Sequence, residues 1–221
     1  MYRLVCLLIL VSGAVGQIVL PGDCNYEDIG GYATGLNVTR MLGTWNQIAR
    51  ISNSMEQGEC SSITVDGIRN AAGYLVALNA SVTDVFNKTR TSRNGIIRAG
   101  PIDGLFSMNV TDFFEGRFVI QATNYIDFAI LYSCDTLTPQ NATQNATKLV
   151  MAWQYHRKAQ LSSSEQASIQ EFVNVNPDLK NITWRYVKHD KTSCGNGAES
   201  LAGPHILIFL AALYKLFLNY L

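Results

Sequence analysis

The sequence predicts an all-β domain, an antiparallel sandwich or barrel, with one helix near its C-terminal end. Short segments that alternate apolar and polar residues follow one another, and short turns join them. Helical periodicity appears only at 162–176. Such a series of strands without intervening helices is typical of an antiparallel sheet. The predicted strand segments are 41–50, 60–68, 74–82, 85–89, 96–99, 105–110, 117–122, 125–134, 148–156 and 182–187.

The first predicted strand, 41–50, begins with a Gly-x-Trp pattern, Gly43-Thr44-Trp45. Successive side chains of a strand point to opposite faces. The alternation therefore predicts one face with Trp45, Gln47 and Ala49 and the other with Asn46, Ile48 and Arg50. Because a tryptophan in a strand is usually a core residue, the pattern alone predicts only that Trp45 is buried.

The helix predicted at 162–176 has recognisable signals at both ends. Ser162 and Glu165 have the spacing of a capping box, in which each side chain accepts a hydrogen bond from the other's backbone N–H. Pro177 ends the helix. Apolar residues recur at helical spacing, so we expect one face to pack on the rest of the domain: Ile169, Phe172 and Val173.

The N-terminal residues have the composition of a secretory signal peptide. Arg3 precedes an apolar run at 4–11, and small residues follow at 12–16. The run is shorter than the ~20 residues of a membrane-spanning helix. We therefore predict cleavage after Gly16 and an extracellular domain at 17–196.

Small residues, a short polar spacer and the apolar run 204–221 follow one another at the C-terminal end. This order predicts a GPI-attachment signal, with 197–221 as the propeptide and the protein on the extracellular face of the plasma membrane. Asn196 is the preferred attachment residue, and Gly197 and Ser193 are the alternatives. A short uncleaved tail anchor and a fusion sequence are the other interpretations. The short spacer and Lys215 within the tail depart from the GPI pattern.

Four cysteines remain after the signal peptide: Cys24, Cys60, Cys134 and Cys194. An even number in a secreted chain predicts two disulfides, and the count allows three pairings. Paired cysteines leave no thiolate for catalysis or for a metal. Lys+Arg and Asp+Glu are balanced at 17 each, and the chain has no basic run, so nucleic acid is not an expected partner.

Seven N-glycosylation sequons predict a heavily glycosylated surface. Their asparagines are Asn37, Asn79, Asn87, Asn109, Asn141, Asn145 and Asn181. Because a glycan cannot lie inside a domain, Asn79 and Asn109 face outward, and strand parity turns their neighbours inward. The expected inward residues are Tyr74, Val76, Leu78 and Val82, unless a bulge intervenes, and Phe106, Met108 and Val110. Asp84 shares the inward parity, so we expect the register to break before it. Asn94-Gly95 predicts a hairpin turn over 91–95.

Three motifs, in order, resemble those of the lipocalin family, and the resemblance spans about 24–194. The motifs are Gly43-Thr44-Trp45, then Thr123-Asn124-Tyr125 leading to Tyr132-Ser133-Cys134, then Arg157 four residues after Trp153. Asn124 stands where the family usually has Asp. Within the family the chain is most similar to the apolipoprotein D group, because of Gly-Thr-Trp-x-x-Ile-Ala-Arg, the Tyr-Ser-Cys strand end, the four cysteines and the GPI-type tail.

The resemblance implies an eight-stranded antiparallel up-and-down β-barrel with the C-terminal helix packed outside, and the disulfides Cys24–Cys134 and Cys60–Cys194. It also implies a closed barrel end built from Gly43, Trp45, Thr123, Tyr125 and Arg157. Strand parity places Leu149, Met151, Trp153, Tyr155 and Arg157 on one side. If Arg157 points inward, its guanidinium can lie over the ring of Trp45 as a cation–π contact. An exposed Arg157 and an ordinary core Trp45 are the alternative.

A barrel of eight strands leaves room for one small ligand. The candidate ligand-binding residues are Tyr74, Leu78, Phe106, Met108, Trp153 and Tyr155. Their apolar character suits a lipophile, but the same side chains would also fill a core. A hollow barrel and a filled one therefore both fit the sequence.

The leading functional expectation is binding of a small hydrophobic ligand, without a cofactor. The resemblance implies retinoids, fatty acids, sterols or bilins, and a role at neuronal surfaces in recognition or axon growth. The alternative is a cell-surface recognition glycoprotein whose barrel is only a scaffold for a surface protein partner. An enzyme is not expected, because His156 and His189, the histidines of the mature chain, have no catalytic or metal-ligand spacing.

Overall fold

The computed structural model describes residues 18–26, 33–51, 53, 56–137 and 145–195. The predicted signal peptide, the propeptide and the candidate residues Asn141, Asn196 and Gly197 lie outside the described residues.

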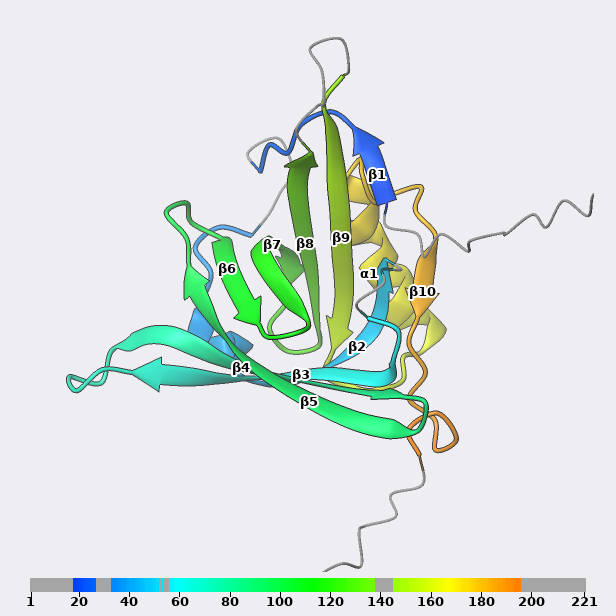
Figure 1. Ribbon diagram of the computed structural model, residues 1–221, viewed down its shortest axis with the longest axis horizontal. Coiled ribbons are helices and arrows are strands. Elements are labelled where there is room, and N and C mark those ends of the chain that lie inside the picture. Colours follow the sequence, from blue (N-terminus) through cyan, green and yellow to red (C-terminus); the bar gives the residue numbers. More distant parts are fainter. Residues whose placement is uncertain (1–17, 27–32, 52, 54–55, 138–144, 196–221) are drawn as a thin grey trace, which may run out of the picture.

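Eight antiparallel strands form a closed barrel, as predicted (Figure 1). Each strand pairs with the next along the chain, and β9 pairs with β2 to close the wall. The strands are β2 (Gly43–Ile51), β3 (Glu59–Arg69), β4 (Leu75–Phe86), β5 (Thr89–Ala99), β6 (Leu105–Val110), β7 (Phe114–Thr123), β8 (Phe128–Leu137) and β9 (Thr147–His156).

Four short elements flank the barrel. Strand β1 (Ile18–Pro21) pairs with β9, and β10 (Trp184–Tyr186) pairs with β2, so both extend the wall. The 3₁₀ turn η1 (Val38–Met41) precedes β2, and helix α1 (Ser163–Val175) lies outside the barrel (Figure 1).

The apolar core is divided into two layers by the barrel wall. One cluster fills the barrel and includes Trp45, Phe106 and Met108. The second lies between the outer face of the wall and α1, and includes Ile130, Ile169 and Val173. Strand alternation produces this division, since adjacent residues of β8 and β9 point to opposite layers.

Helix α1 has the ends that the sequence predicts. Ser162 is the N-cap, its hydroxyl accepts from the backbone N–H of Glu165, and the Glu165 carboxylate accepts from the Ser162 N–H at 2.8 Å. The helix ends two residues before Pro177. Ile169 and Val173 are buried, whereas Phe172 is at the edge of the interface and its ring lies 5.1 Å from that of Phe128.

The turn predicted at Asn94-Gly95 is wrong, because both residues lie within β5. The hairpin between β4 and β5 turns instead at Asn87 and Lys88, whose φ angles are +50° and +64°. A Cβ on Gly95 would lie 2.0 Å from the carbonyl oxygen of Asn109. Glycine is therefore required at 95 by the close approach of β6, not by a turn.

The predicted faces of β2 are correct only for the first half of the strand. Gln47 pairs with Tyr155 and Ala49 with Gln154, so Ile48 is an extra residue and β2 has a bulge. The bulge reverses the parity. Ala49 therefore belongs to the outer layer, whereas Arg50 bonds to Gln47 inside the barrel.

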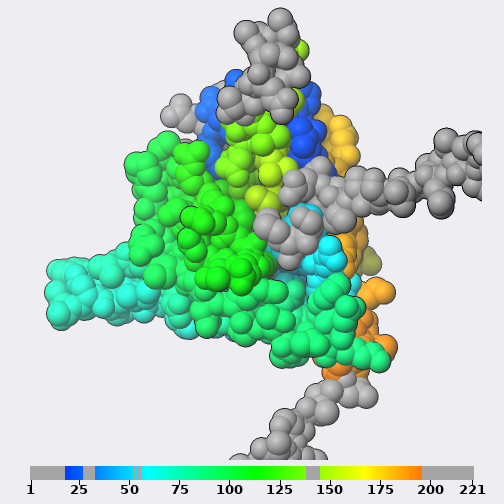
Figure 2. Space-filling model, viewed as in Figure 1, coloured from blue at the N-terminus to red at the C-terminus, as the bar shows by residue number. Residues whose placement is uncertain are grey.

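The inward prediction for Tyr74 and Val76 is wrong, because these side chains are 71% and 56% exposed. The β2–β3 pairing ends at Val65 and the β4–β5 pairing at Leu78, so the rest of the β3–β4 hairpin has no neighbouring strand. This hairpin projects clear of the molecule (Figure 2). Strand parity cannot reveal where a barrel wall stops.

The register break expected before Asp84 is also absent from β4, whose pairing with β5 is continuous from Leu78 to Phe86. The β3–β4 ladder is irregular at two other places, between Glu59 and Ser62 of β3 and at Val76, which is an extra residue of β4. Asp84 keeps its buried position because Arg93 donates to its carboxylate at 2.9 Å.

The two disulfides are Cys24–Cys134 and Cys60–Cys194, the pairing that the resemblance implies. The first joins the N-terminal arm to β8, and the second joins the C-terminal segment to β3. The sequon asparagines within the described residues are all exposed: Asn37, Asn79, Asn87, Asn109, Asn145 and Asn181. In the part of the chain described here, no helix has the length and apolarity needed to span a membrane.

Candidate functional site

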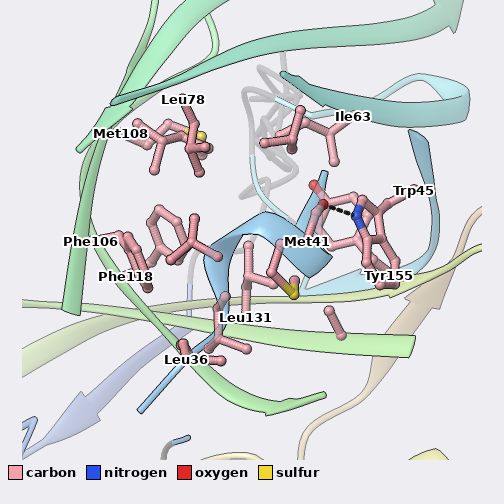
Figure 3. Close-up of a pocket in the computed structure, with 15 residues that line it drawn as sticks. Leu36, Met41, Trp45, Ile63, Leu78, Phe106, Met108, Phe118, Leu131 and Tyr155 are labelled. Atoms are coloured by element: carbon pink, nitrogen blue, oxygen red, sulfur yellow. Dashed lines mark hydrogen bonds between the residues drawn. The ribbon is translucent and has the colours of Figure 1, made fainter. Parts of the chain in front are cut away.

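An apolar cavity of about 50 Å³ lies inside the barrel (Figure 3). Its lining comes from the segment before β2 and from strands β2 to β9, so residues distant in sequence meet around it. The lining residues are Leu36, Val38, Met41, Trp45, Ile63, Val65, Leu78, Ile97, Phe106, Met108, Phe118, Ile120, Ala129, Leu131 and Tyr155. The barrel is thus nearly filled, with a small apolar space at its centre.

Four of the six candidate ligand-binding residues line this cavity: Leu78, Phe106, Met108 and Tyr155. Figure 3 shows Leu78, Met108 and Phe106 on the side opposite Trp45 and Tyr155. Phe106 stacks on Phe118 with their ring centroids 5.5 Å apart. Tyr74 is remote from the cavity, on the projecting hairpin. Trp153 is buried in the barrel but is not part of the cavity lining.

Trp153 instead contacts a buried carboxylate that the sequence did not reveal. Its indole N–H donates to both oxygens of Glu56, at 2.8 and 2.9 Å, and its ring meets that of Phe114 edge to face at 5.3 Å. The Gln47 amide donates to the same carboxylate at 3.3 Å. Glu56 is only 4% exposed, although its polar loop between β2 and β3 suggests a solvated side chain.

Arg50 is the counter-ion of Glu56. Its Nε lies 3.8 Å from the carboxylate, and its other nitrogens donate to the Gln47 side chain and, at 2.6 Å, to the Gly58 carbonyl. Arg50 is 1% exposed. Burial raises the pKa of Glu56 and lowers that of Arg50, and the attraction between the two charges opposes both shifts only in part. Such a buried pair costs more in desolvation than a surface pair does.

Trp45 and Arg157 meet at the end of the barrel where β2 begins and β9 ends. The Arg157 guanidinium carbon lies 3.5 Å from the centroid of the Trp45 ring, so the predicted cation–π contact is confirmed. Arg157 also donates to the carbonyls of Thr44 and Leu42, each at 2.9 Å. The Trp45 indole donates to the Met41 carbonyl at 2.8 Å (Figure 3). Gly43 has a φ of +97°, and a Cβ there would lie 3.2 Å from Arg157.

The Thr123-Asn124-Tyr125 motif forms the tight connection between β7 and β8 at the same end. The Asn124 side-chain oxygen accepts from the backbone N–H groups of Ile126, Asp127 and Phe128. An Asp side chain can accept the same bonds, so Asn124 preserves the turn. The Tyr125 hydroxyl accepts from the Asn37 N–H at 3.1 Å, and Arg40 lies 4.4 Å above its ring.

The described residues contain no group of three His, Cys, Asp or Glu side chains that could hold a metal ion. His156 is buried, its Nδ1 accepts from the Lys158 N–H at 2.9 Å, and burial lowers its pKa. The His189 Nε2 lies 2.9 Å from the Gln47 carbonyl oxygen. Both rings therefore have backbone partners, and neither lines the cavity.

Comparison with known proteins gives structural matches only. No protein-family model and no curated sequence matches the chain. Insecticyanin from the tobacco hornworm Manduca sexta matches with a TM-score of 0.63 and 18% identity, over 81% of this chain and 93% of its own. Lobster apocrustacyanin A1 matches at 0.59 and 17%, over 79% and 92%. The cockroach allergen Per a 4 matches at 0.54 and 16%, over 77% and 97%.

These matches cover nearly the whole length of each neighbour. Likeness at this identity establishes the fold. The chain has the lipocalin architecture, a closed eight-stranded antiparallel barrel with one helix packed outside.

Proposed function

We propose that the protein binds a small hydrophobic ligand inside its barrel. The apolar cavity supports this proposal, because all its lining residues except Tyr155 and Trp45 have purely apolar side chains. At about 50 Å³ the cavity is smaller than the roughly 300–1,000 Å³ of typical ligand pockets. A ligand therefore has to displace side chains, and Met41 and Met108 are the most adaptable of the lining.

The test is a fluorescence titration with retinoids, fatty acids, sterols and bilins. Trp45 lines the cavity, so a bound lipophile is expected to quench or shift tryptophan emission. Ala129→Leu fills the cavity and is expected to weaken binding at least tenfold. Ser107→Leu, on the exposed face of β6, is the matched control and is expected to leave the affinity unchanged. An unaltered affinity in the Ala129→Leu protein, or no binding by the whole panel, would overturn the proposal.

We also propose that the protein acts at the cell surface through a GPI anchor. The exposed sequons, the predicted signal peptide and the C-terminal sequence pattern support this location, and the resemblance to neuronal surface lipocalins suggests a role in neuronal recognition or axon guidance. Phosphatidylinositol-specific phospholipase C is expected to release the protein from cells expressing the full chain. Retention after release of a known GPI-anchored protein in the same sample would argue against the anchor.

The small cavity favours a second candidate function, in which the barrel is a scaffold for a surface protein partner. The Ala129→Leu protein distinguishes ligand-dependent recognition from the scaffold function. If recognition needs the ligand, cells displaying this variant lose binding to partner cells; if the barrel is a scaffold, they keep it.

A further inference from the structure

The Glu56 carboxylate is held inside the barrel by groups that belong to the barrel wall. Trp153 is on β9, and Gln47 and Arg50 are on β2, whereas Glu56 comes from the connection between β2 and β3. The wall therefore presents two neutral N–H donors and one cation to a single carboxylate. Charge-assisted hydrogen bonds of this kind are the strong ones.

The wall groups are incompletely satisfied by Glu56. The Nε of Arg50 is buried and has no hydrogen-bond partner among the described residues. Its distance of 3.8 Å from the carboxylate is that of an ion pair without a hydrogen bond. A buried donor without a partner is costly, so a carboxylate that reaches Arg50 more closely would be bound better than Glu56 is.

These groups adjoin the apolar cavity. Tyr155 lines the cavity and pairs with Gln47 across the β2–β9 ladder. The next inward-facing pair along the same ladder is Arg50 with Trp153. A molecule whose chain fills the cavity and passes Tyr155 therefore arrives at Arg50 and Trp153.

We propose that Trp153, Gln47 and Arg50 form a receptor for the carboxylate of an amphiphilic acid whose apolar chain lies in the cavity, and that Glu56 occupies this receptor in the empty protein. The inference rests on the proposed lipophile-binding function and adds the ligand's head group. Glu56 is then an internal competitor. An incoming acid replaces its charge beside Arg50, whereas a neutral lipophile cannot, so ligand acids are selected over their esters.

The experiment compares palmitate with its methyl ester on the full domain. In the Glu56→Gln protein the competitor has lost its charge, so the affinity for palmitate is expected to rise at least tenfold and that for the ester to change less than twofold. Glu59→Gln is the matched control, since Glu59 pairs with Arg185 outside the barrel, and neither affinity is expected to change. The double variant Arg50→Met/Glu56→Gln removes both buried charges and is expected to bind acid and ester alike.

Equal gains for acid and ester in Glu56→Gln, or a preference for acid that survives in the double variant, would overturn the receptor. Binding of the ester without any preference for acid leaves the lipophile function standing. Failure of both ligands to bind any variant refutes the receptor for amphiphilic acids, whereas the lipophile function is refuted only when the whole ligand panel fails to bind.

A measurement on the unaltered protein keeps the test open if a variant does not fold. The indole N–H proton signal of Trp153, identified by its loss in Trp153→Phe or by site-specific labelling, is expected to shift with palmitate and to stay in place with the methyl ester. If palmitate binds and the Trp153 signal does not shift, the receptor assignment is overturned.

Discussion

The guanidinium carbon of Arg157 lies 3.5 Å from the centroid of the Trp45 ring. The contact joins the end of the last barrel strand, β9, to the start of the first, β2. The same guanidinium donates to the Leu42 and Thr44 carbonyls. Arg157 thereby joins the two strands that must meet to close the barrel, and it lies over Trp45, which lines the apolar cavity.

Replacing Arg157 with Gln is expected to lower the free energy of unfolding by about 2 kcal/mol, from the lost cation–π contact and the lost bonds to partly exposed carbonyls. Arg157→Lys is expected to recover only part of the loss, because an ammonium lacks the planar fork. Arg90→Gln, exposed on β5, is the control. Denaturant titrations measure all three, and an Arg157→Gln protein as stable as this control would contradict the assigned role.

Gly95→Ala is expected to destabilise the barrel by about 2 kcal/mol or more, because the new Cβ would lie 2.0 Å from the Asn109 carbonyl oxygen and 2.6 Å from the Val110 Cα. Relief requires β5 and β6 to separate, since both obstacles are backbone atoms. Arg98→Ala, exposed on the same strand, is expected to stay within about 0.5 kcal/mol of the original. Thermal unfolding distinguishes this packing role from a turn role, for which Gly95→Asn would be tolerated.

Ser162→Ala is expected to lower the free energy of unfolding by about 1 kcal/mol, because the backbone N–H of Glu165 loses its hydrogen-bond acceptor. Ser163→Ala lies one residue inside the helix, in the same exposed segment, and serves as the control. Equal stabilities in urea would show that the capping box contributes nothing measurable.

The stability of the protein is expected to depend on pH through Glu56. Burial holds the pKa of this carboxyl above its ordinary value of 4.5 in the folded state. Well below that value the carboxyl is protonated in both states, so its contribution to stability is fully present and does not change with pH. As the pH rises, the unfolded chain loses the proton first, so folding stability falls until the folded pKa is passed.

Glu56→Gln removes this titration. The difference in unfolding free energy, variant minus original, is therefore expected to move in favour of the variant as the pH rises from about 4, and to level off above the folded pKa. Urea titrations at a series of pH values measure the difference. A difference that stays constant from pH 4 to 8 would contradict the assignment.

Sequence patterns were sufficient for the features that depend on neighbouring residues along the chain. The alternation in β6 and β9 places Phe106, Met108 and Tyr155 inside, because the faces of an unbroken strand follow from its geometry alone. The capping box of α1 and its end before Pro177 are likewise local. The Arg157–Trp45 contact and the disulfide pairing were predicted through the resemblance to lipocalins, and the structure has both.

Tertiary structure decided the features that depend on which strands meet and where. The bulge at Ile48 reverses the face of Arg50, and the alternation of residue types carries no sign of it. Tyr74 lies beyond a second bulge, at Val76, and where β4 has no second neighbour. Glu56 lies in a polar loop, and its buried carboxylate is bound by the side chains of Trp153 and Gln47 and paired with Arg50.

The sequence by itself therefore determined that the chain forms an antiparallel β domain with one outer helix and, through its motifs, a barrel with a lipocalin-type closed end. Only the tertiary structure decided how little space the barrel leaves and that a carboxylate of the chain is buried within it. The physical reason is that periodicity specifies the face of a residue relative to its own strand. Register, bulges and loop reach arise from pairing between strands distant in sequence.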